Sequence, residues 1–179
     1  MSQTASSVPS TWERMMERQE IDNELSLAGA QELLAATSAA HLAYVAADES
    51  PRVILVGYFW TGEQFVISTA RTAPKVPALS AHPHVALAID AGETPDQARA
   101  LSIRGRASVE IVDGVVPEYL AAARRTMEAG AAAQFERNVR AMYHQMARIA
   151  ITPSWVRFYD FGTGRIPQFL QELAEQDRS

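Results

Sequence analysis

The chain has 179 residues, 47% of them hydrophobic, and a formal net charge of -5. This length suits one domain with a sizeable core, and the negative charge argues against nucleic acid or an anionic membrane as a partner. The absence of cysteine excludes disulfides, thiolate catalysis and thiolate metal sites. No apolar run is long enough to span a membrane and no signal peptide is visible, so we expect a cytoplasmic protein.

The chain opens with a segment rich in Ser, Thr and Pro, residues 1–10, which we expect to be disordered. Two helices are predicted to follow it, with Thr11 as the N-cap of the first and Ser26 as the N-cap of the second. Apolar residues recur with helical spacing in the second helix. We expect three of them to face the core: Leu27, Leu33 and Leu34.

The hydrophobic period then changes from that of a helix to that of strands. Five strands are predicted, over residues 41–47, 52–60, 64–69, 85–90 and 101–112. The first three are joined by short turns, which favours antiparallel pairing. Gly105 lies inside the fifth strand, where a bulge or a barrel corner is expected.

The last third of the chain is predicted to begin with a helical insertion over about residues 115–147. Pro117 suits the first position of a helix, and a stripe of apolar residues at helical spacing is expected to pack into the core: Phe135, Val139, Met142, Tyr143 and Met146. A sixth strand follows, in which Pro153 indicates a sheet edge or a kink, and then a final helix. The sum is one domain over residues 11–179, a six-stranded, mostly antiparallel β-barrel with added helices.

Two positive charges, Arg71 and Lys75, lie between the strand that ends at Thr69 and a short predicted helix. Free N–H groups and the helix dipole favour an anion at such a helix start. Thr69 and Thr72 offer hydroxyl donors, and the planar guanidinium of Arg71 suits phosphate. The alternative is a solvated loop that carries two surface cations.

The order and spacing of the block over about residues 33–109, together with residues 148–161, resemble the pyridoxamine 5'-phosphate oxidase-like split-barrel flavoproteins. This resemblance implies a six-stranded split β-barrel that forms a homodimer. It also implies a cofactor at the dimer interface, which is FMN or, in an actinobacterial branch of the family, the deazaflavin F420.

The resemblance also assigns cofactor-binding positions. The backbone of the first cofactor strand is implied to run along the isoalloxazine ring, and this strand comprises Arg52, Val53, Ile54, Leu55 and Val56. The pair at the strand end falls on Ser68 and Thr69, and the phosphate-binding lysine on Lys75, with Arg71 and Thr72 able to reach the same phosphate.

The chain departs from the true oxidase at three places. Pro74 stands where the family has an arginine before the lysine, and Gly57 stands where it has a lysine at the end of the cofactor strand. The substrate-binding Arg-x-His near the C-terminus is replaced by "WVRFYDF". These departures argue against oxidation of vitamin B6 compounds but do not argue against flavin binding, which remains the expectation.

Aromatic and basic residues supply the candidates for the substrate side: Tyr58, Trp60, Trp155, Arg157 and Tyr159. Large aromatic side chains commonly serve packing, which is the alternative for each of them. No histidine pair has the spacing of a metalloprotease site, so no metal site is expected. The strand over residues 52–60 is apolar on both faces, which favours cover by a second subunit.

Three functions remain open from the sequence. The first is an FMN-dependent oxidoreductase that acts on a small planar molecule, because the flavin itself supplies the hydride chemistry and no catalytic triad is needed. The second is the same reaction with F420. The third is a non-catalytic flavin-binding module that stores, senses or shields the cofactor.

Overall fold

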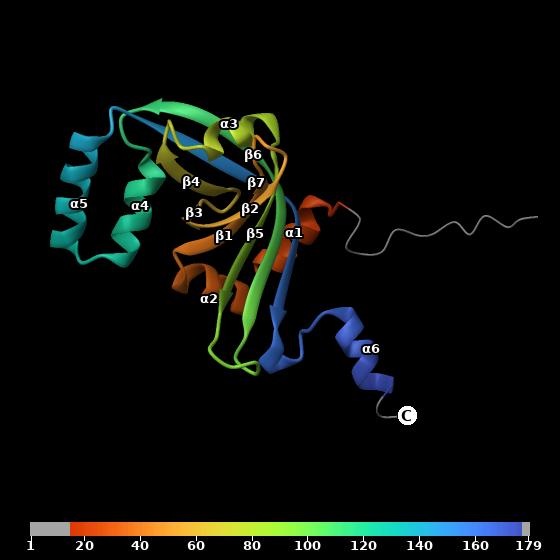
Figure 1. The fold of residues 1–179 in the computed structure, drawn as a ribbon. Helices are drawn as coiled ribbons and strands as arrows, with labels where there is room; N and C mark the ends of the chain where they lie inside the picture. Colours follow the sequence, from red (N-terminus) through yellow and green to blue (C-terminus); the bar gives the residue numbers. More distant parts are fainter. Residues whose placement is uncertain (1–14, 177–179) are drawn as a thin grey trace, which may run out of the picture.

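The computed structural model describes residues 15–176. The predicted disordered segment 1–10 and the predicted Thr11 cap lie outside these residues. The described chain forms an antiparallel, curved sheet with helices at both ends and on one side (Figure 1). None of the described helices is long and apolar enough to cross a membrane.

The first two helices are α1 (Arg18–Leu25) and α2 (Ala28–Ala36). A reciprocal capping box between Glu17 and Glu20 starts α1. The predicted Ser26 cap is wrong, because the link between the helices is so short that Ser26 ends α1, with its N–H donated to Asp22. The N-cap of α2 is Leu27, without a side-chain hydrogen bond. Leu33 and Leu34 are buried as predicted.

The sheet has seven strands in the order β2-β1-β5-β6-β7-β4-β3, and every pairing is antiparallel. Their bounds are β1 Ala39–Val45, β2 Pro51–Gly57, β3 Phe59–Trp60, β4 Phe65–Ala70, β5 His84–Ala91, β6 Arg99–Asp113 and β7 Gln145–Asp160. The mainly-β antiparallel class is therefore as expected, whereas the predicted six strands are seven.

The additional strand arises because the predicted strand over residues 52–60 breaks at Tyr58. Its first part, β2, pairs with β1, and its last part, β3, pairs with β4 at the opposite end of the strand order. The N–H of Tyr58 leaves the ladder and donates to the carbonyl of Ser38 at 3.1 Å. The two ends of the sheet are thus joined through one residue, which curls the sheet around a shared core.

The long strands β6 and β7 are kinked where Gly105 was predicted to mark a bulge. Arg104 pairs with Trp155 but Gly105 pairs with Pro153, so that β7 has one extra residue, Ser154. Pro153 marks both a kink and a free edge, because β7 pairs with β4 only as far as Ile151 and at Pro153 has a strand partner only in β6 among the described residues. A Cβ atom on Gly105 would lie 2.6 Å from the carbonyl oxygen of Thr152, which explains the need for glycine.

The main core lies on the inner face of the curved sheet, where α1 and α2 pack with residues such as Leu42, Leu87 and Ile103. A smaller core lies between the sheet and the helices that connect β6 to β7, which are α4 (Pro117–Thr126) and α5 (Ala129–Met142). Pro117 occupies the first turn of α4 as predicted.

The predicted apolar stripe of the insertion extends beyond its helix. Phe135 and Val139 lie in α5, but this helix ends at Met142, and Met142 is exposed. Met146 is buried in β7, because Gln145 already pairs with Asp113 of β6. Because pairing with β6 already begins at Gln145, the helix ends earlier than the helical spacing of apolar residues in the sequence predicted.

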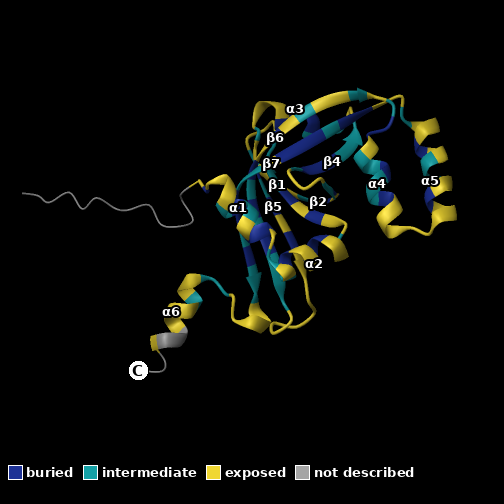
Figure 2. Cartoon of the chain, turned by 180° about the vertical axis from the view of Figure 1, so that it is seen from behind, coloured by how far each residue is buried: buried dark blue, intermediate teal, exposed yellow. Residues whose placement is uncertain are grey.

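Three short elements complete the described chain: α3 (Lys75–Ala81), a 3-10 turn (Phe161–Thr163) and α6 (Gln168–Gln176). α3 follows β4 and packs near β6 and β1. α6 stands away from the sheet at the C-terminal end, and its described side chains are largely exposed (Figure 2).

Candidate functional site

The connection between β4 and α3 brings two of the predicted phosphate-site residues together. Nζ of Lys75, the first residue of α3, lies 3.4 Å from Oγ1 of Thr69 at the end of β4. Burial lowers the pKa of Lys75 below its ordinary value, because a charged ammonium is less well solvated there. Lys75 is also the only lysine of the sequence.

Arg71 and Thr72 lie in the same connection but line a different hollow, with Tyr143 and His144 from the end of the insertion. Arg71 and Thr72 form the turn that follows β4, and both side chains are exposed. The structure therefore pairs Lys75 with Thr69 and leaves Arg71 and Thr72 on the far side of the loop, next to the end of α5.

The predicted cofactor strand is the edge strand β2, which pairs within the described chain only with β1. One edge of its backbone therefore has N–H and C=O groups outside the ladder. β2 contacts β4, and α3 contacts β1, so β2 lies in the neighbourhood of the Lys75 connection. The guanidinium of Arg52 binds Asp48 at 2.9 Å, in the turn that precedes β2.

Side chains of β2 alternate between the two faces of the sheet. Val56 is buried in the core and Ile54 packs against it, whereas Val53 and Leu55 on the other face are each 67% exposed. The outer face of β2 is thus apolar and uncovered by the described chain, as expected for a strand that needs cover on both faces.

Two rows of directly paired residues cross this outer face from β2 to β7. The first row is Val53, Ala43, Ala86, Arg104 and Trp155, and the second is Leu55, His41, Ala88, Ser102 and Arg157. Five strands at a spacing of about 4.8 Å make each row roughly 19 Å long. Val53 and Leu55 of the cofactor strand therefore share one face with the substrate-side candidates Trp155 and Arg157, and Val53 and Trp155 border the same hollow.

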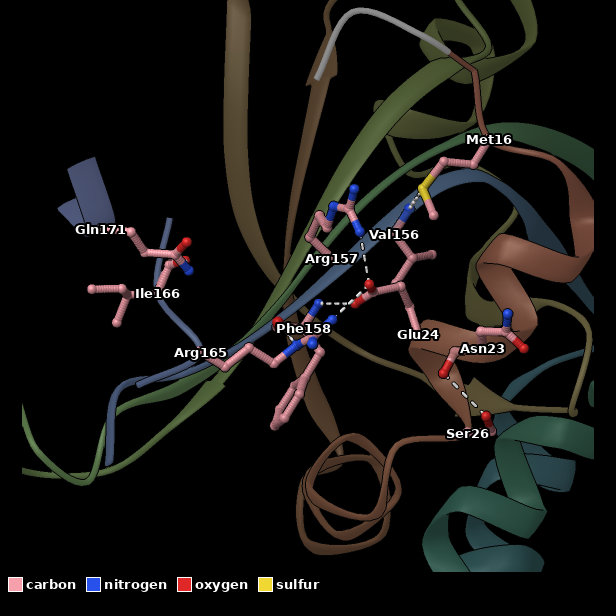
Figure 3. A network of polar contacts seen from close by, with 10 residues as sticks. All are labelled: Met16, Asn23, Glu24, Ser26, Val156, Arg157, Phe158, Arg165, Ile166 and Gln171. Atoms are coloured by element: carbon pink, nitrogen blue, oxygen red, sulfur yellow. Dashed lines mark hydrogen bonds and ion pairs between the residues drawn. The ribbon is translucent and has the colours of Figure 1, made fainter. Parts of the chain in front are cut away.

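Arg157 belongs to a buried polar cluster that sequence reasoning missed (Figure 3). Glu24 of α1, 6% exposed, accepts hydrogen bonds from Arg157 at 2.8 Å, from Arg165 at 2.6 Å and from the backbone N–H of Phe158 at 2.9 Å. Burial alone would raise the pKa of Glu24, but these three donors lower it below its ordinary value. The cluster joins α1, β7 and the segment before α6.

Trp155 is buried at the end of the first row, with the guanidinium of Arg104 stacked 4.5 Å from its ring centre. Tyr159 is partly buried on the same face of β7, opposite Ala100. These two rings and Arg157 border a hollow of about 660 Å³ between β7 and α6.

Two of the other substrate-side candidates serve packing. Tyr58 is 1% exposed in the core, its hydroxyl 3.0 Å from Oγ1 of Thr37, and burial raises its pKa. Trp60 packs on Phe65 with ring centres 4.4 Å apart. Ser68 lines a hollow of about 170 Å³ under α4, next to Gly57. No group of three or more metal-ligating side chains occurs among residues 15–176.

With this geometry in place, comparison with known proteins identifies the family. The family model of pyridoxamine 5'-phosphate oxidase matches residues 28–160. The match covers more than half of the chain, so the chain belongs to the pyridoxamine 5'-phosphate oxidase family. No curated protein matches it.

Solved structures share the fold at low sequence identity. A conserved hypothetical protein, Rv2991 from Mycobacterium tuberculosis, is 20% identical with a TM-score of 0.57, over 86% of this chain and 90% of that one. An F420 reductase is 23% identical with a TM-score of 0.55, over 70% and 94%. HutZ, the heme storage protein from Vibrio cholerae, is 15% identical with a TM-score of 0.52, over 71% and 89%. At these identities the likeness concerns the fold alone.

Proposed function

We propose that the chain binds a flavin or deazaflavin cofactor and works as an oxidoreductase on a small planar substrate. One observation carries this proposal. The strand β2 has an unpaired backbone edge, and it lies in the neighbourhood of a connection where the only lysine of the chain is partly buried beside a threonine hydroxyl.

The residues present suit such a cofactor. A phosphate at the β4–α3 connection would restore to the Lys75 ammonium the solvation that burial removes, and Thr69 would donate a second hydrogen bond. Peptide groups along the free edge of β2 can bind the polar edge of a flat heterocycle. The space beside Gly57, at the end of this strand, is open, because an added Cβ would meet nothing closer than 3.8 Å.

The residues support either FMN or F420, since both carry a flat ring and a phosphate. Family membership supports FMN, and the fold shared with the F420 reductase supports the deazaflavin. When bound, either group supplies hydride transfer. The protein then has to bind the phosphate, orient the ring and exclude water, which requires no acid–base triad.

We further propose a homodimer in which each cofactor lies between subunits. The exposed pair Val53 and Leu55 needs cover, and a twofold partner is the common way to cover an apolar face. Trp155 and Arg157 lie on the same outer face, four strands from β2 in the strand order, and Trp155 borders the hollow next to Val53. A partner that covers Val53 and Leu55 would therefore also cover Trp155.

The first test is the role of Lys75. A hydrogen bond from a charged group contributes about 1.5–3 kcal/mol, so Lys75→Ala is expected to weaken FMN or F420 binding roughly ten- to a hundredfold. Fluorescence titration measures this, with Arg106→Ala, on the same sheet but away from the β4–α3 connection, as a control. An unchanged dissociation constant for Lys75→Ala would remove the phosphate role.

Because Lys75 is the only lysine, reductive ¹³C-methylation adds one side-chain NMR signal besides that of the α-amino group. Its titration should give a lowered pKa in the free protein and a higher pKa with the cofactor bound. Affinity should accordingly fall as the pH rises through the lowered pKa.

Absorbance and mass spectrometry of material released by heat identify the cofactor. Turnover with a reduced cofactor separates an oxidoreductase from a storage or sensor module, and a heme spectrum would contradict both.

A further inference from the structure

The helix α6 lacks the packing that a helix of its length needs. It has nine residues, and Phe169 and Leu173, one turn apart on the same side, are 61% and 55% exposed. It makes no extensive contact with another element of the described chain. Because isolated helices of this length are marginal in water, α6 needs a surface on which to bury its apolar side.

A hollow of about 520 Å³ on the outer face of the sheet is shaped to receive such a helix. Its floor is the row Val53, Ala43, Ala86, Arg104 and Trp155, in which two alanines lie between larger side chains. The small side chains lower the middle of the row and so leave room for a helix. Arg104, whose guanidinium stacks on Trp155, brings positive charge to this hollow, whereas the charge of Arg52 is paired with Asp48.

The helix and the hollow lie on either side of Trp155. This residue borders both the hollow next to β2 and the separate hollow that Phe169 of α6 borders. The projecting helix and the depression are therefore adjacent on the outer face, on the two sides of Trp155. A twofold axis near the middle of such a face brings each helix to the depression of the other copy.

We propose that α6 of each subunit docks in the hollow between β2 and Trp155 of a second copy of this chain. Phe169 and Leu173 fill the apolar part of the hollow, in the manner of an amphipathic helix in a groove. Glu172, on the exposed surface of α6, complements the positive charge of Arg104. A second copy is the occupant because it carries both complementary parts at once.

This docking names the elements of the dimer proposed above and rests on that dimer, not on the flavin. It places the α6 of the partner over Val53, at the start of the cofactor strand. The partner would thereby supply part of the wall of the cofactor site and shield it from water.

The test uses the absence of cysteine. Leu173→Cys and Val53→Cys are made in separate full-length chains that carry tags of different mass, and the chains are mixed and oxidised without added cofactor. The expected product is a disulfide-linked heterodimer. Leu173→Cys mixed with Ala133→Cys, on the α5 helix away from the hollow, is the matched control and should not cross-link. Failure of the first pair to link above this control overturns the docking.

The double variant Leu173→Cys, Val53→Cys tests whether α6 folds onto its own sheet. The proposal expects linked dimers, and a monomer with an internal disulfide would overturn it. Sedimentation of Glu172→Arg and Phe169→Asp should show dimer dissociation constants raised about tenfold or more, with Glu63→Arg in the β3–β4 turn unchanged. Flavin titration of the unmodified chain is a separate measurement, so failure of the docking and failure of cofactor binding are distinguishable.

Discussion

Glu24 is the residue on which the attachment of α1 to β7 depends. Its carboxylate is 6% exposed and serves three donors from the far end of the sequence, Arg157, the N–H of Phe158, and Arg165. Of its partners only the Phe158 N–H is buried, whereas the side chains of Arg157 and Arg165 are 34% and 42% exposed, so loss of the carboxylate leaves one buried donor with a weaker partner and two arginines that water can solvate. Removal of Glu24 is therefore expected to lower the free energy of unfolding, even if the ion pairs themselves add no net stability.

We predict that Glu24→Gln lowers the free energy of unfolding by about 1–3 kcal/mol, because the amide is a weaker acceptor for the buried Phe158 N–H while the two partly exposed arginines can be solvated. Urea denaturation measures this. Glu136→Gln, which disrupts only exposed ion pairs on α4 and α5, is the control and should change stability little. Equal effects of the two substitutions would contradict the structural role of the buried cluster.

The same residue predicts a pH dependence. The pKa of Glu24 is lower in the folded chain than in the unfolded chain, so the unfolded state takes up its proton first as the pH falls. The stabilisation is fully present above the ordinary glutamate pKa and is lost as the pH falls through the lower folded value. Glu24→Gln should flatten this acid limb of the stability curve, and an identical limb in both proteins would assign it to other carboxylates.

At the scale of elements, the kink shared by β6 and β7 sets the shape of the sheet. Beyond it, β7 leaves β4, with which it pairs only between Met146 and Ile151. The second half of β7 is then free to contact α1 and to carry Trp155 and Arg157 on the outer face. The bulge thus separates the half of β7 that lies between β6 and β4 in the sheet from the half that borders the candidate site.

We predict that Gly105→Ala destabilises the fold by about 1–3 kcal/mol, the usual range for overpacking. Its Cβ would lie 2.6 Å from a backbone carbonyl oxygen and 2.9 Å from the Ile151 side chain. Gly130→Ala in α5, where an added Cβ meets nothing within 4 Å, is the matched control and should stabilise by up to about 1 kcal/mol. Thermal unfolding of both variants checks the contrast, and a neutral Gly105→Ala would show that the bulge relaxes.

At the scale of the whole molecule, family membership does not transfer the activity of pyridoxamine 5'-phosphate oxidase to this chain. Gly57 cannot supply a charge at the end of the cofactor strand, and Arg157 in the segment that replaces Arg-x-His already binds Glu24. Both positions matter for a doubly charged substrate phosphate, because such a group needs several fixed cations.

We therefore predict no significant oxidation of pyridoxine or pyridoxamine 5'-phosphate by the FMN-loaded protein. The measurement is formation of pyridoxal 5'-phosphate under air, with a dedicated oxidase as the positive control. Turnover comparable to that control would mean that the substrate-side residues lie elsewhere than on the second half of β7.

By itself the sequence determined the features that depend on local pattern. The alternation of apolar residues predicted most of the strands, Gly105 marked the bulge, and Pro117 marked the start of α4. The approach of Lys75 to Thr69 also follows from their separation of only six positions in the sequence. Each of these depends on backbone geometry or on neighbours within one or two turns of chain, which the residue types reveal directly.

Only the tertiary structure decided the features that depend on distant segments. The break at Tyr58 reflects a hydrogen bond to Ser38 and two different partner strands, and the Glu24 cluster joins residues more than 130 positions apart. The two rows of the outer face likewise require the register of five strands. All three features depend on which strands become neighbours and on the register of their pairing. A single sequence does not specify the pairing, because the same local pattern is compatible with many pairings.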